Sequence, residues 1–404
     1  MRYGLEEVSL LIIDESHRCL KNYAYTFVVR NYKINSKYKQ VLGLTASPGT
    51  EKKIIEDIAK NLGIETIEIR TRESVDVKPY LKELKFKTIG IEFPEEFKII
   101  TAHIRKMYQR KIEELKNRKL LFLPPTKTNI LKLQGKIMSQ INTGDKNFNV
   151  LSGASACAQA IKLAYLIELL ETQTLYSANN YIKSMFEQAS QNKSKAVKHI
   201  INNPEFKKAY ILINELLVKK KEHPKIFELK NIVEERIKNN LKHKMIIFSQ
   251  YRDTVIKIAQ ELNMIEGINA KVFVGQAKKA NTGLSQKEQQ EIMEQFKRGD
   301  INVITATSIA EEGLDIPEVN AVIFYEPIPS AIRKIQRAGR TARLMNGELI
   351  ILMTLDTLDE IFYYAARSKE KKMYQAIDAI KKDIAEGKSF LQEEKTENKQ
   401  KTLF

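Results

Sequence analysis

Short apolar runs alternate with amphipathic helical patterns near the start of the chain. Residues 8–13 and 41–44 are apolar runs, and residues 64–69 alternate between apolar and polar positions. The apolar spacing of residues 54–62 predicts a helix. Buried parallel strands are short and apolar, so we interpret these segments as three strands with intervening helices. Residues 1–79 are therefore predicted to form part of an α/β domain.

The C-terminal part of the chain shows the same alternation more completely. Apolar runs predict five strands separated by helical patterns, and a capping box at Ser285 predicts the start of one helix. This order is typical of a complete doubly wound parallel sheet, which we assign to residues 245–385. The strands are expected at residues 245–249, 270–274, 302–306, 321–325 and 348–353.

The segment between these two domains, residues 80–244, is predicted to be mostly helical. Its apolar positions recur at helical spacing, and proline-containing or polar stretches interrupt it. Residues 182–244 contain 15 Lys and Arg against 7 Asp and Glu. The polar tail, residues 386–404, is expected to be disordered. The aromatic side chains of the helical segment are interpreted as core rather than as base-stacking platforms; they are Tyr108, Phe122, Tyr165, Tyr181 and Phe186.

Composition narrows the class of protein. The 404 residues contain two cysteines, Cys19 and Cys157, which excludes a disulfide framework and a zinc site built on cysteine pairs. No apolar run predicts a transmembrane helix and the start lacks a secretory signal, so we expect a cytoplasmic protein. The net charge of +17 favours a polyanionic partner, with nucleic acid first. A generally lysine-rich proteome is the alternative explanation.

An apolar strand that ends in two carboxylates, Asp14 and Glu15, is the first candidate site. Ligands bind at the carboxyl ends of buried parallel strands. Asp14 could hold Mg²⁺ through water, and Glu15 could orient and deprotonate an attacking water. By itself, a strand that ends in Asp-Glu is at least as often a surface or helix-capping feature as a catalytic site. Its continuation to His17, with Thr45 and Ser47 after the next strand, is more specific.

A second candidate site follows the later strands. Arg340 and Arg343 lie three residues apart, on one face of a predicted helix, where both could reach phosphate oxygens. An arginine that contacts the transition state of phosphoryl transfer can raise the rate about 10³- to 10⁵-fold. Thr307 and Ser308 follow another strand and could donate hydrogen bonds to a nucleic-acid phosphate. A solvated basic face is the alternative for the arginines.

The motifs occur in a characteristic order: DESH, TAS, FSQYR, VGQA, ATSIAEEGLDIP and QRAGRTAR. This order resembles that of superfamily 2 helicases, and within them the archaeal Hef and FANCM type, over about residues 5–384. The resemblance implies two RecA-like lobes joined by a helical, thumb-like insert. It also implies ATP-dependent helicase activity, with ATP and Mg²⁺ as cofactors, on forked or branched DNA in replication-fork repair. A more distant resemblance to RIG-I-like receptors leaves double-stranded RNA as an alternative substrate.

The resemblance also assigns roles to individual residues. Asp14 and Glu15 match the Mg²⁺-binding and water-activating pair, and His17 matches the link between the nucleotide site and the lobe interface. Thr45 and Ser47 match the motif that couples hydrolysis to movement, and the resemblance also implies that they contact the nucleic acid. The other matched residues are the γ-phosphate sensors Gln336, Arg340 and Arg343, the nucleotide contacts Gly313 and Asp315, and the nucleic-acid contacts Ser249, Gly275, Gln276, Thr307 and Ser308.

The sequence also departs from the family pattern. No G-x-x-x-x-G-K-[ST] phosphate-binding loop occurs in the 404 residues, and Ala342 stands where the family has glycine. We therefore expect an incomplete first lobe with exposed apolar faces, and weak or no ATP hydrolysis by these residues alone. A non-hydrolysing binding fragment, or a subunit completed by another polypeptide, is the alternative. The tail from Gln400 to Phe404 resembles part of a sliding-clamp-binding peptide, with a plain disordered tail as the alternative.

Overall fold

The computed structural model divides the chain into two compact units, which are described separately. The first unit comprises Met1–Leu81, Ile328–Arg337 and Tyr364–Phe404, and the second comprises Lys82–Pro327 and Ala338–Tyr363. The residues that the structure describes are 4–21, 23–46, 48–49, 51–68, 70, 74–80, 84–144, 147–240, 242–276, 283–307, 319–328 and 347–386.

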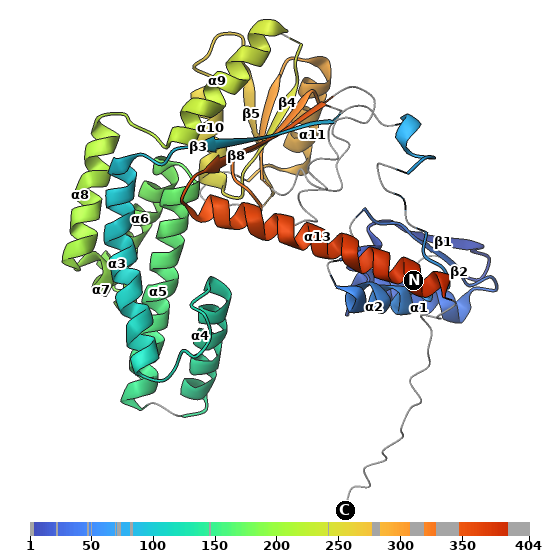
Figure 1. Ribbon diagram of the computed structural model, residues 1–404, viewed down its shortest axis with the longest axis horizontal. Coiled ribbons are helices and arrows are strands. Elements are labelled where there is room, and N and C mark those ends of the chain that lie inside the picture. The colour runs from blue at the N-terminus through green and yellow to red at the C-terminus, as the bar shows by residue number, and fades with distance from the viewer. Residues whose placement is uncertain are drawn as a thin grey trace, which may run out of the picture. The chain divides into compact units, whose positions relative to one another are not determined.

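The first unit contains a two-stranded parallel sheet with helices on one face (Figure 1). Inward-facing side chains of both strands pack with α1 and α2, so the core lies between the sheet and these helices. The apolar face of α2 repeats every three to four residues, as the sequence predicts. The elements are β1 (Leu10–Ile13), η1 (Ser16–Arg18), α1 (Ala24–Asn35), β2 (Gln40–Gly43), α2 (Lys52–Leu62), η2 (Lys78–Tyr80) and the later turns of α13 (Leu358–Ala385).

The other face of this small sheet is open. Leu10, Ile12 and Leu42 are 43%, 55% and 43% exposed, and Leu44, which follows β2, is 46% exposed. Side chains alternate between the two faces of a strand, so these leucines and isoleucine form one apolar face. The expected exposure of apolar faces in this domain is confirmed.

The prediction of a third strand at residues 64–69 is wrong over its described part. Residues 64–68 form no strand. Ile64 packs with the cluster that α2 and β1 form, and Ile67 packs against Ile55 and the later turns of α13. The alternating pattern therefore reflects apolar side chains that are partly buried against helices.

The second unit is built around a six-stranded parallel sheet with the order β3-β8-β7-β4-β6-β5 (Figure 1). The five predicted strands are confirmed with ends shifted by about one residue, and the capping box at Ser285 begins α11 as predicted. After β6 the chain crosses to the opposite side of β4, so the winding direction reverses there. The strands are β3 (Leu84–Ile91), β4 (Met245–Phe248), β5 (Ala270–Phe273), β6 (Val303–Ala306), β7 (Ala321–Phe324) and β8 (Gly347–Thr354).

Strand β3 is absent from the predicted strands. Its sequence begins Leu-Lys-Phe-Lys and leads directly into a long helical pattern. It pairs in parallel with β8 over its whole length and forms an edge of the sheet, where Phe86 is 47% exposed. The segment before the helical bundle therefore completes the sheet that follows the bundle.

Helices α3 to α8 form a bundle inserted between β3 and β4 (Figure 1). The central helix, α5, packs against α3, α4, α6 and α7. Among the helices that the structure describes, α5 is the one that could cross a membrane by length and composition, but half of its apolar stretch is buried inside the protein, as in the core helix of a bundle. The helices are α3 (Glu95–Asn117), α4 (Lys127–Asn142), α5 (Phe148–Thr172), α6 (Leu175–Ser190), α7 (Lys195–Ile201) and α8 (Pro204–Val218).

Helices α9 and α10 cover one face of the six-stranded sheet. Leu229 and Val233 of α9 belong to the same buried cluster as Ile247 and Ile323 of the sheet. The segment before β4 thus contributes to the sheet's core, while the domain boundary at residues 244 and 245 remains a prediction. The helices of this part are α9 (Pro224–Asn239), α10 (Arg252–Leu262), α11 (Gln286–Arg298) and the first turns of α13.

Candidate functional site

The carboxyl edge of the two-stranded sheet carries the predicted acidic pair. Asp14 and Glu15 directly follow β1, and Glu15 has a left-handed backbone with φ of 51° and ψ of 45°. The Glu15 amide donates a hydrogen bond of 2.8 Å to Asp14 Oδ1. Left-handed residues other than glycine are uncommon and often occur at functional sites. We call this segment the acidic turn.

His17 links the acidic turn to the second strand of the sheet. Its Nδ1 atom lies 3.0 Å from the Thr45 hydroxyl and 3.3 Å from Glu15 Oε2. The backbone supports this contact, because the Ser16 amide donates a hydrogen bond of 2.8 Å to the Leu44 carbonyl. The structure therefore brings together predicted site residues that lie almost 30 positions apart in the sequence.

Burial is the largest influence on the His17 side chain. It lowers the pKa of His17; Glu15 opposes this effect and Arg18 adds to it. The imidazole is therefore neutral at pH 7. A neutral Nδ1 either accepts a hydrogen bond from Thr45 or donates one to Glu15. These two contacts compete for one nitrogen, which couples the carboxylate to the second strand.

The acidic turn fits a magnesium ion that a nucleotide would share. Asp14 is exposed at the strand end, and Glu15 Oε2 accepts no hydrogen bond from the described residues. At phosphate-transfer sites Mg²⁺ takes one or two carboxylates, and its other ligands are water and phosphate oxygens. Asp14 would hold the ion, while Glu15 would remain available to a water. Within the described ranges, no three His, Cys, Asp or Glu side chains form a metal site by themselves.

Several predicted site residues lie outside the described residues. They are one residue of the TAS motif and the predicted contacts after β6 and β7. These residues are Ser47, Ser308, Gly313, Asp315, Gln336, Arg340 and Arg343, and the tail from Gln400 to Phe404 also lies outside.

The remaining predicted residues lie at the carboxyl edge of the six-stranded sheet. Strands β4, β5 and β6 end in register, so the residues that follow them meet at one edge. Gln276 is exposed there, and the Gly275 carbonyl accepts a hydrogen bond of 3.1 Å from the Arg252 guanidinium. Thr307 is only 9% exposed. The structure brings these residues together, and their contact with nucleic acid stays a prediction.

Ser249, also predicted to contact nucleic acid, has a structural role in this arrangement. Its side chain is fully buried, and its hydroxyl donates a hydrogen bond of 3.1 Å to Gln173 Oε1. The Thr254 hydroxyl donates to the same oxygen over 2.8 Å. Because Gln173 directly follows α5, these bonds join the bundle to the sheet. The hydroxyl of Ser249 is thus used inside the protein.

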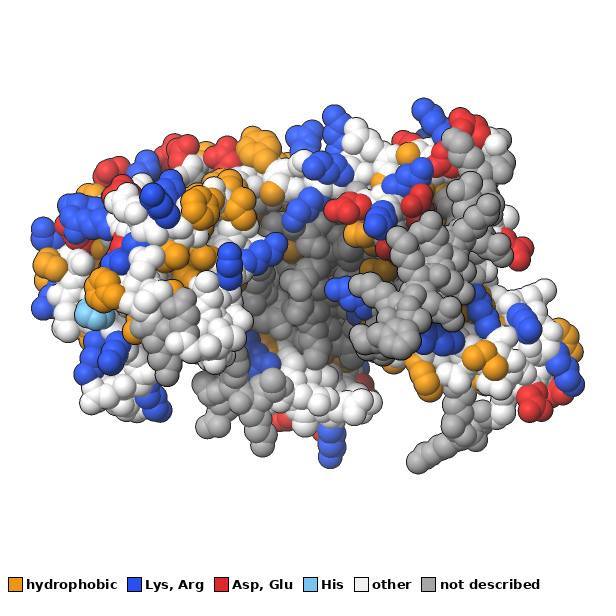
Figure 2. Space-filling model, turned by 90° about the horizontal axis from the view of Figure 1, so that it is seen from below, with side chains coloured by type: hydrophobic (Ala, Val, Ile, Leu, Met, Phe, Trp, Pro, Cys, Tyr) orange, Lys and Arg blue, Asp and Glu red, His pale blue; other side chains and the backbone are white. Residues whose placement is uncertain are grey.

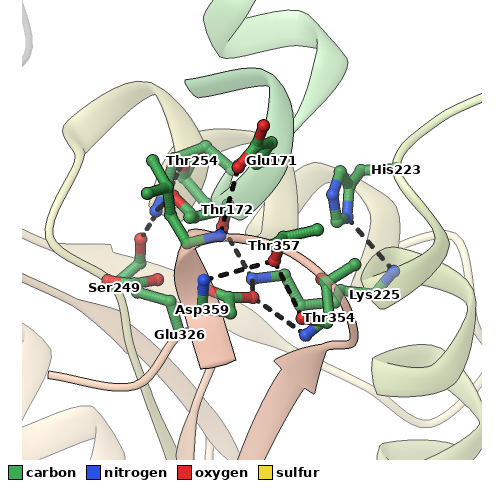
Figure 3. Close-up of polar contacts among 12 residues, drawn as sticks. Glu171, Thr172, His223, Lys225, Ser249, Thr254, Glu326, Thr354, Thr357 and Asp359 are labelled. Atoms are coloured by element: carbon green, nitrogen blue, oxygen red, sulfur yellow. Dashed lines mark hydrogen bonds and ion pairs between the residues drawn. The ribbon is translucent and has the colours of Figure 1, made fainter. Parts of the chain in front are cut away.

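A buried ion pair lies close to these hydroxyls (Figure 3). Lys225 Nζ lies 2.7 Å from Asp359 Oδ2, and both side chains are fully buried. The ammonium also donates a hydrogen bond of 2.7 Å to the Thr172 carbonyl and lies 4.6 Å from the centre of the Tyr325 ring. The Thr354 amide donates to Asp359 Oδ2 over 3.0 Å. The pair therefore joins α9, α13 and the end of α5.

Glu171 extends this network to another bundle helix. The Arg105 guanidinium of α3 donates hydrogen bonds of 2.9 and 2.6 Å to Glu171 Oε1. The Leu358 amide, at the start of α13, donates to Glu171 Oε2 over 3.1 Å. Burial raises the pKa of Glu171 and of Asp359. The contacts with Arg105 and Lys225 lower these pKa values, but by less than burial raises them. The bundle and the sheet thus share one buried polar network.

The sequence contains one signal for this network that our prediction did not use. Lys225 and Asp359 each lie in the first turn of a helix, where charged residues are ordinary. Lys225, however, lies four and seven residues before Leu229 and Ile232, so helical spacing puts it on the apolar face of α9. A charge on an apolar face predicts a buried partner. The identity of that partner depends on the fold.

Comparison with known proteins identifies the family. Residues 225–345 match the helicase conserved C-terminal domain, and residues 96–224 match the helical bundle of an ATP-dependent RNA helicase family. The crystal structure of the Pyrococcus furiosus Hef helicase domain is similar, with 42% identity and a TM-score of 0.68. That match covers 90% of this chain and 75% of the Hef domain.

Two longer proteins are similar over most of this chain. A Methanocaldococcus jannaschii protein named as an ATP-dependent RNA helicase is 38% identical, over 92% of this chain and 46% of its own length. The ATP-dependent DNA helicase mph1 of Neurospora crassa is 32% identical, over 86% of this chain and 31% of its own length. The chain thus spans less than half of either relative. With its two parallel sheets and helical bundle, the chain belongs to the Hef and FANCM type of superfamily 2 helicases.

Proposed function

We propose that the chain acts as an ATP-dependent helicase or translocase on forked or branched DNA, in replication-fork repair in the cytoplasm, with ATP and Mg²⁺ as cofactors. The observation that supports this most is the contact of His17 with both Glu15 and Thr45. The relatives add support, since mph1 is named as a DNA helicase and Hef as a helicase. The sequence alone left double-stranded RNA open.

Hydrolysis would begin at the acidic turn. ATP hydrolysis needs a base that directs water at the γ-phosphate, and positive charge that stabilises the transition state. Glu15 would orient and deprotonate this water. Asp14 would hold Mg²⁺, which when bound neutralises charge on the phosphates. From the sequence, Arg340 and Arg343 would contact the same phosphates from the second lobe.

His17 would pass the state of the nucleotide site to the second strand. Its Nδ1 atom can satisfy either Glu15 or Thr45 at one time, as a neutral imidazole. When Glu15 accepts a hydrogen bond from a water, the His17 imidazole would accept its hydrogen bond from Thr45. The family motif that Thr45 matches couples hydrolysis to movement, so this exchange is a direct physical route for the coupling.

DNA would be held mainly through its phosphates. The exposed Gln276 lies at the carboxyl edge of the six-stranded sheet, and residues 182–244 carry an excess of Lys and Arg. Each neutralised phosphate releases counterions, so binding should weaken steeply as salt is raised. Such contacts carry little sequence information.

The test is ATP hydrolysis by the 404-residue chain with and without forked DNA. Because these residues contain no phosphate-binding loop, we expect weak hydrolysis; any fork-stimulated hydrolysis that is measured should fall about 10²-fold or more in Glu15→Gln, because a general base is removed. Glu7→Gln is the matched control, since that side chain is 78% exposed and its ion pair in the described part of the chain is with the exposed Lys37.

Two outcomes would redirect the proposal. Salt-sensitive fork binding without hydrolysis would assign the chain a binding role, in line with the absence of a G-x-x-x-x-G-K-[ST] sequence. Stronger stimulation by double-stranded RNA than by forked DNA would assign it an RNA substrate.

A further inference from the structure

One end of the helical bundle exposes two phenylalanine rings. Phe122, in the loop after α3, is 84% exposed, and Phe148, the first residue of α5, is 79% exposed. Leu123 and Leu151 next to them are 58% and 46% exposed. The interpretation of Phe122 as a core residue is wrong, because Leu121 takes the buried position in this loop. We call this end, formed by residues 118–126 and 148–151, the bundle tip.

The loop of the bundle tip is held by internal contacts. Leu121 is buried in the cluster that α3, α4 and α5 form. The Tyr108 hydroxyl donates a hydrogen bond of 2.8 Å to the Pro125 carbonyl, and the Asn129 side chain donates one of 3.0 Å to the Pro124 carbonyl. These contacts hold the loop in place while the ring of Phe122 faces solvent. The exposed position is therefore built into the fold.

Arg118 connects the two parts of the bundle tip. Its guanidinium lies 5.5 Å from the centre of the Phe148 ring and donates a hydrogen bond of 3.4 Å to Asn149 Oδ1. Glu114 Oε1 accepts a further bond of 3.3 Å from Arg118 Nε. In the chain Arg118 is four residues before Phe122. A planar cation thus lies over one of the two exposed aromatic side chains, Phe148.

The end of α3, next to the rings, is basic. Residues 110–119 contain five Lys and Arg and two Asp and Glu. One of these acids, Glu114, is paired with both Lys111 and Arg118. Figure 2 views the molecule from the side of the bundle tip and shows hydrophobic side chains among basic ones over the bundle. This charge complements a polyanion.

We propose that the bundle tip binds unpaired bases at the junction of a forked nucleic acid, with Phe122 and Phe148 stacking on the bases. The surrounding Lys and Arg side chains contact the phosphates. Aromatic stacking accepts any base, because every base has a π-face, and it suits a surface that reads structure rather than sequence. The rings carry no polar group, so stacking removes apolar area from water. This inference rests on the proposed function and names the part of the substrate that the bundle contacts.

The experiment compares binding of two labelled DNAs by fluorescence anisotropy: a fork with two unpaired arms and a blunt duplex of the same sequence. The proteins are the 404-residue chain, Phe122→Ala, Phe148→Ala and the double variant. Phe227→Ala is the matched control, since that ring is 71% exposed on α9, away from the bundle tip. We expect about 5-fold or more weaker fork binding for each ring removed, little change for the duplex, and recovery in Phe122→Trp.

A fluorescent base analogue placed at the junction gives a second readout. Its emission should be quenched by the unchanged chain and by Phe227→Ala, and not by the double variant. Melting curves followed by circular dichroism should be the same for all variants, because these rings bury little area in the fold.

The outcomes separate this inference from the proposed function. Unchanged fork affinity in the double variant, with salt-dependent fork binding intact, overturns the stacking proposal alone and leaves a protein partner as the occupant to seek. Equal weakening on fork and blunt duplex also overturns it, because the rings would then not select unpaired bases. A chain that binds neither DNA contradicts the proposed function itself.

Discussion

The two parallel sheets differ in what meets their carboxyl edges. In the first unit this edge ends in Asp14, which is exposed, and Glu15, which is half-buried. In the second unit the edge carries Ser249, whose buried hydroxyl donates to Gln173 at the end of the bundle helix α5, near a fully buried ion pair between α9 and α13. The same kind of strand end is thus exposed to solvent in one place and covered by the helical bundle in the other.

This difference teaches that position at a strand end does not by itself define a site. What matters is whether polar groups are already satisfied by the protein. At the closed edge each buried hydrogen bond has a cost if one partner is removed. Substitutions there should reduce stability, whereas substitutions at the acidic turn should change turnover and leave stability almost unchanged. The predictions below test this contrast.

The largest effect is expected from Lys225→Met. This change leaves Asp359 buried without its partner. The free energy of unfolding should fall by about 3–5 kcal/mol, measured by urea denaturation. Lys238→Met is the control, because its pair with Glu234 is exposed and contributes little. A double variant, Lys225→Met with Asp359→Leu, should recover much of the lost stability. If Lys225→Met alone leaves the free energy of unfolding unchanged, the contrast between the two sheet edges is wrong.

A smaller loss is expected from Gln173→Met. The side-chain oxygen of Gln173 accepts hydrogen bonds from the buried hydroxyls of Ser249 and Thr254. Methionine keeps a similar volume but accepts no strong hydrogen bond. We expect a decrease of about 1–3 kcal/mol in the free energy of unfolding. A change below the error of the denaturation curve would show that water or another group replaces this acceptor.

His223 should make stability depend on pH. Burial lowers the pKa of this fully buried histidine well below its ordinary value of 6.5, and Lys225 adds to the effect. The unfolded chain therefore takes up a proton that the folded state excludes as the pH falls through 6.5. This contribution to stability is complete above pH 6.5 and is lost below it, by up to about 1.4 kcal/mol per pH unit.

The variant His223→Asn tests this pH dependence. Asparagine can still cap α9, where the His223 side chain accepts a hydrogen bond from the Lys225 amide, but it does not titrate. The decrease in the free energy of unfolding between pH 7 and pH 5 should be shallower in the variant. His17 is present in both proteins, so its effect cancels. Equal slopes would exclude His223 as the source.

The smallest change in stability is expected at the acidic turn. Thr45→Val keeps the side-chain shape but removes the hydroxyl that lies 3.0 Å from His17 Nδ1. The free energy of unfolding should change by about 1 kcal/mol or less. Stimulation of ATP hydrolysis by forked DNA should nevertheless fall relative to basal hydrolysis. A large loss of stability with normal stimulation would reverse the assignment of the two edges.

The sequence predicted those parts of the molecule that depend on local pattern. The strands β4, β6 and β7 are short runs of apolar residues buried on both faces, so hydrophobicity alone locates them. The acidic turn was found because Asp14, Glu15 and His17 lie within four consecutive residues. Strand β3 was not predicted because Lys85 and Lys87 interrupt its apolar pattern. An edge strand tolerates such lysines.

The parts that depend on distant contacts could not be predicted in the same way. Ser249 was correctly placed at a strand end, but its burial depends on Gln173 from the bundle. Lys225 and Asp359 look like ordinary helix-start residues until the fold brings them together. In the sequence, Phe122 cannot be told from an aromatic residue of a helical core. Its exposure follows from the fold, in which its neighbour Leu121 takes the buried position.

The pairing of β3 with β8 has a consequence for how the protein is made. On the ribosome, Leu84–Ile91 emerges before the bundle, and its partner Gly347–Thr354 emerges after every other strand of that sheet. At ordinary rates of translation the early strand waits for roughly tens of seconds. Such long-range closure is slow, and an unpaired strand is open to other chains meanwhile. The first strand synthesised for this sheet is thus among the last to be secured, and nascent chains are most exposed to misassembly at this edge.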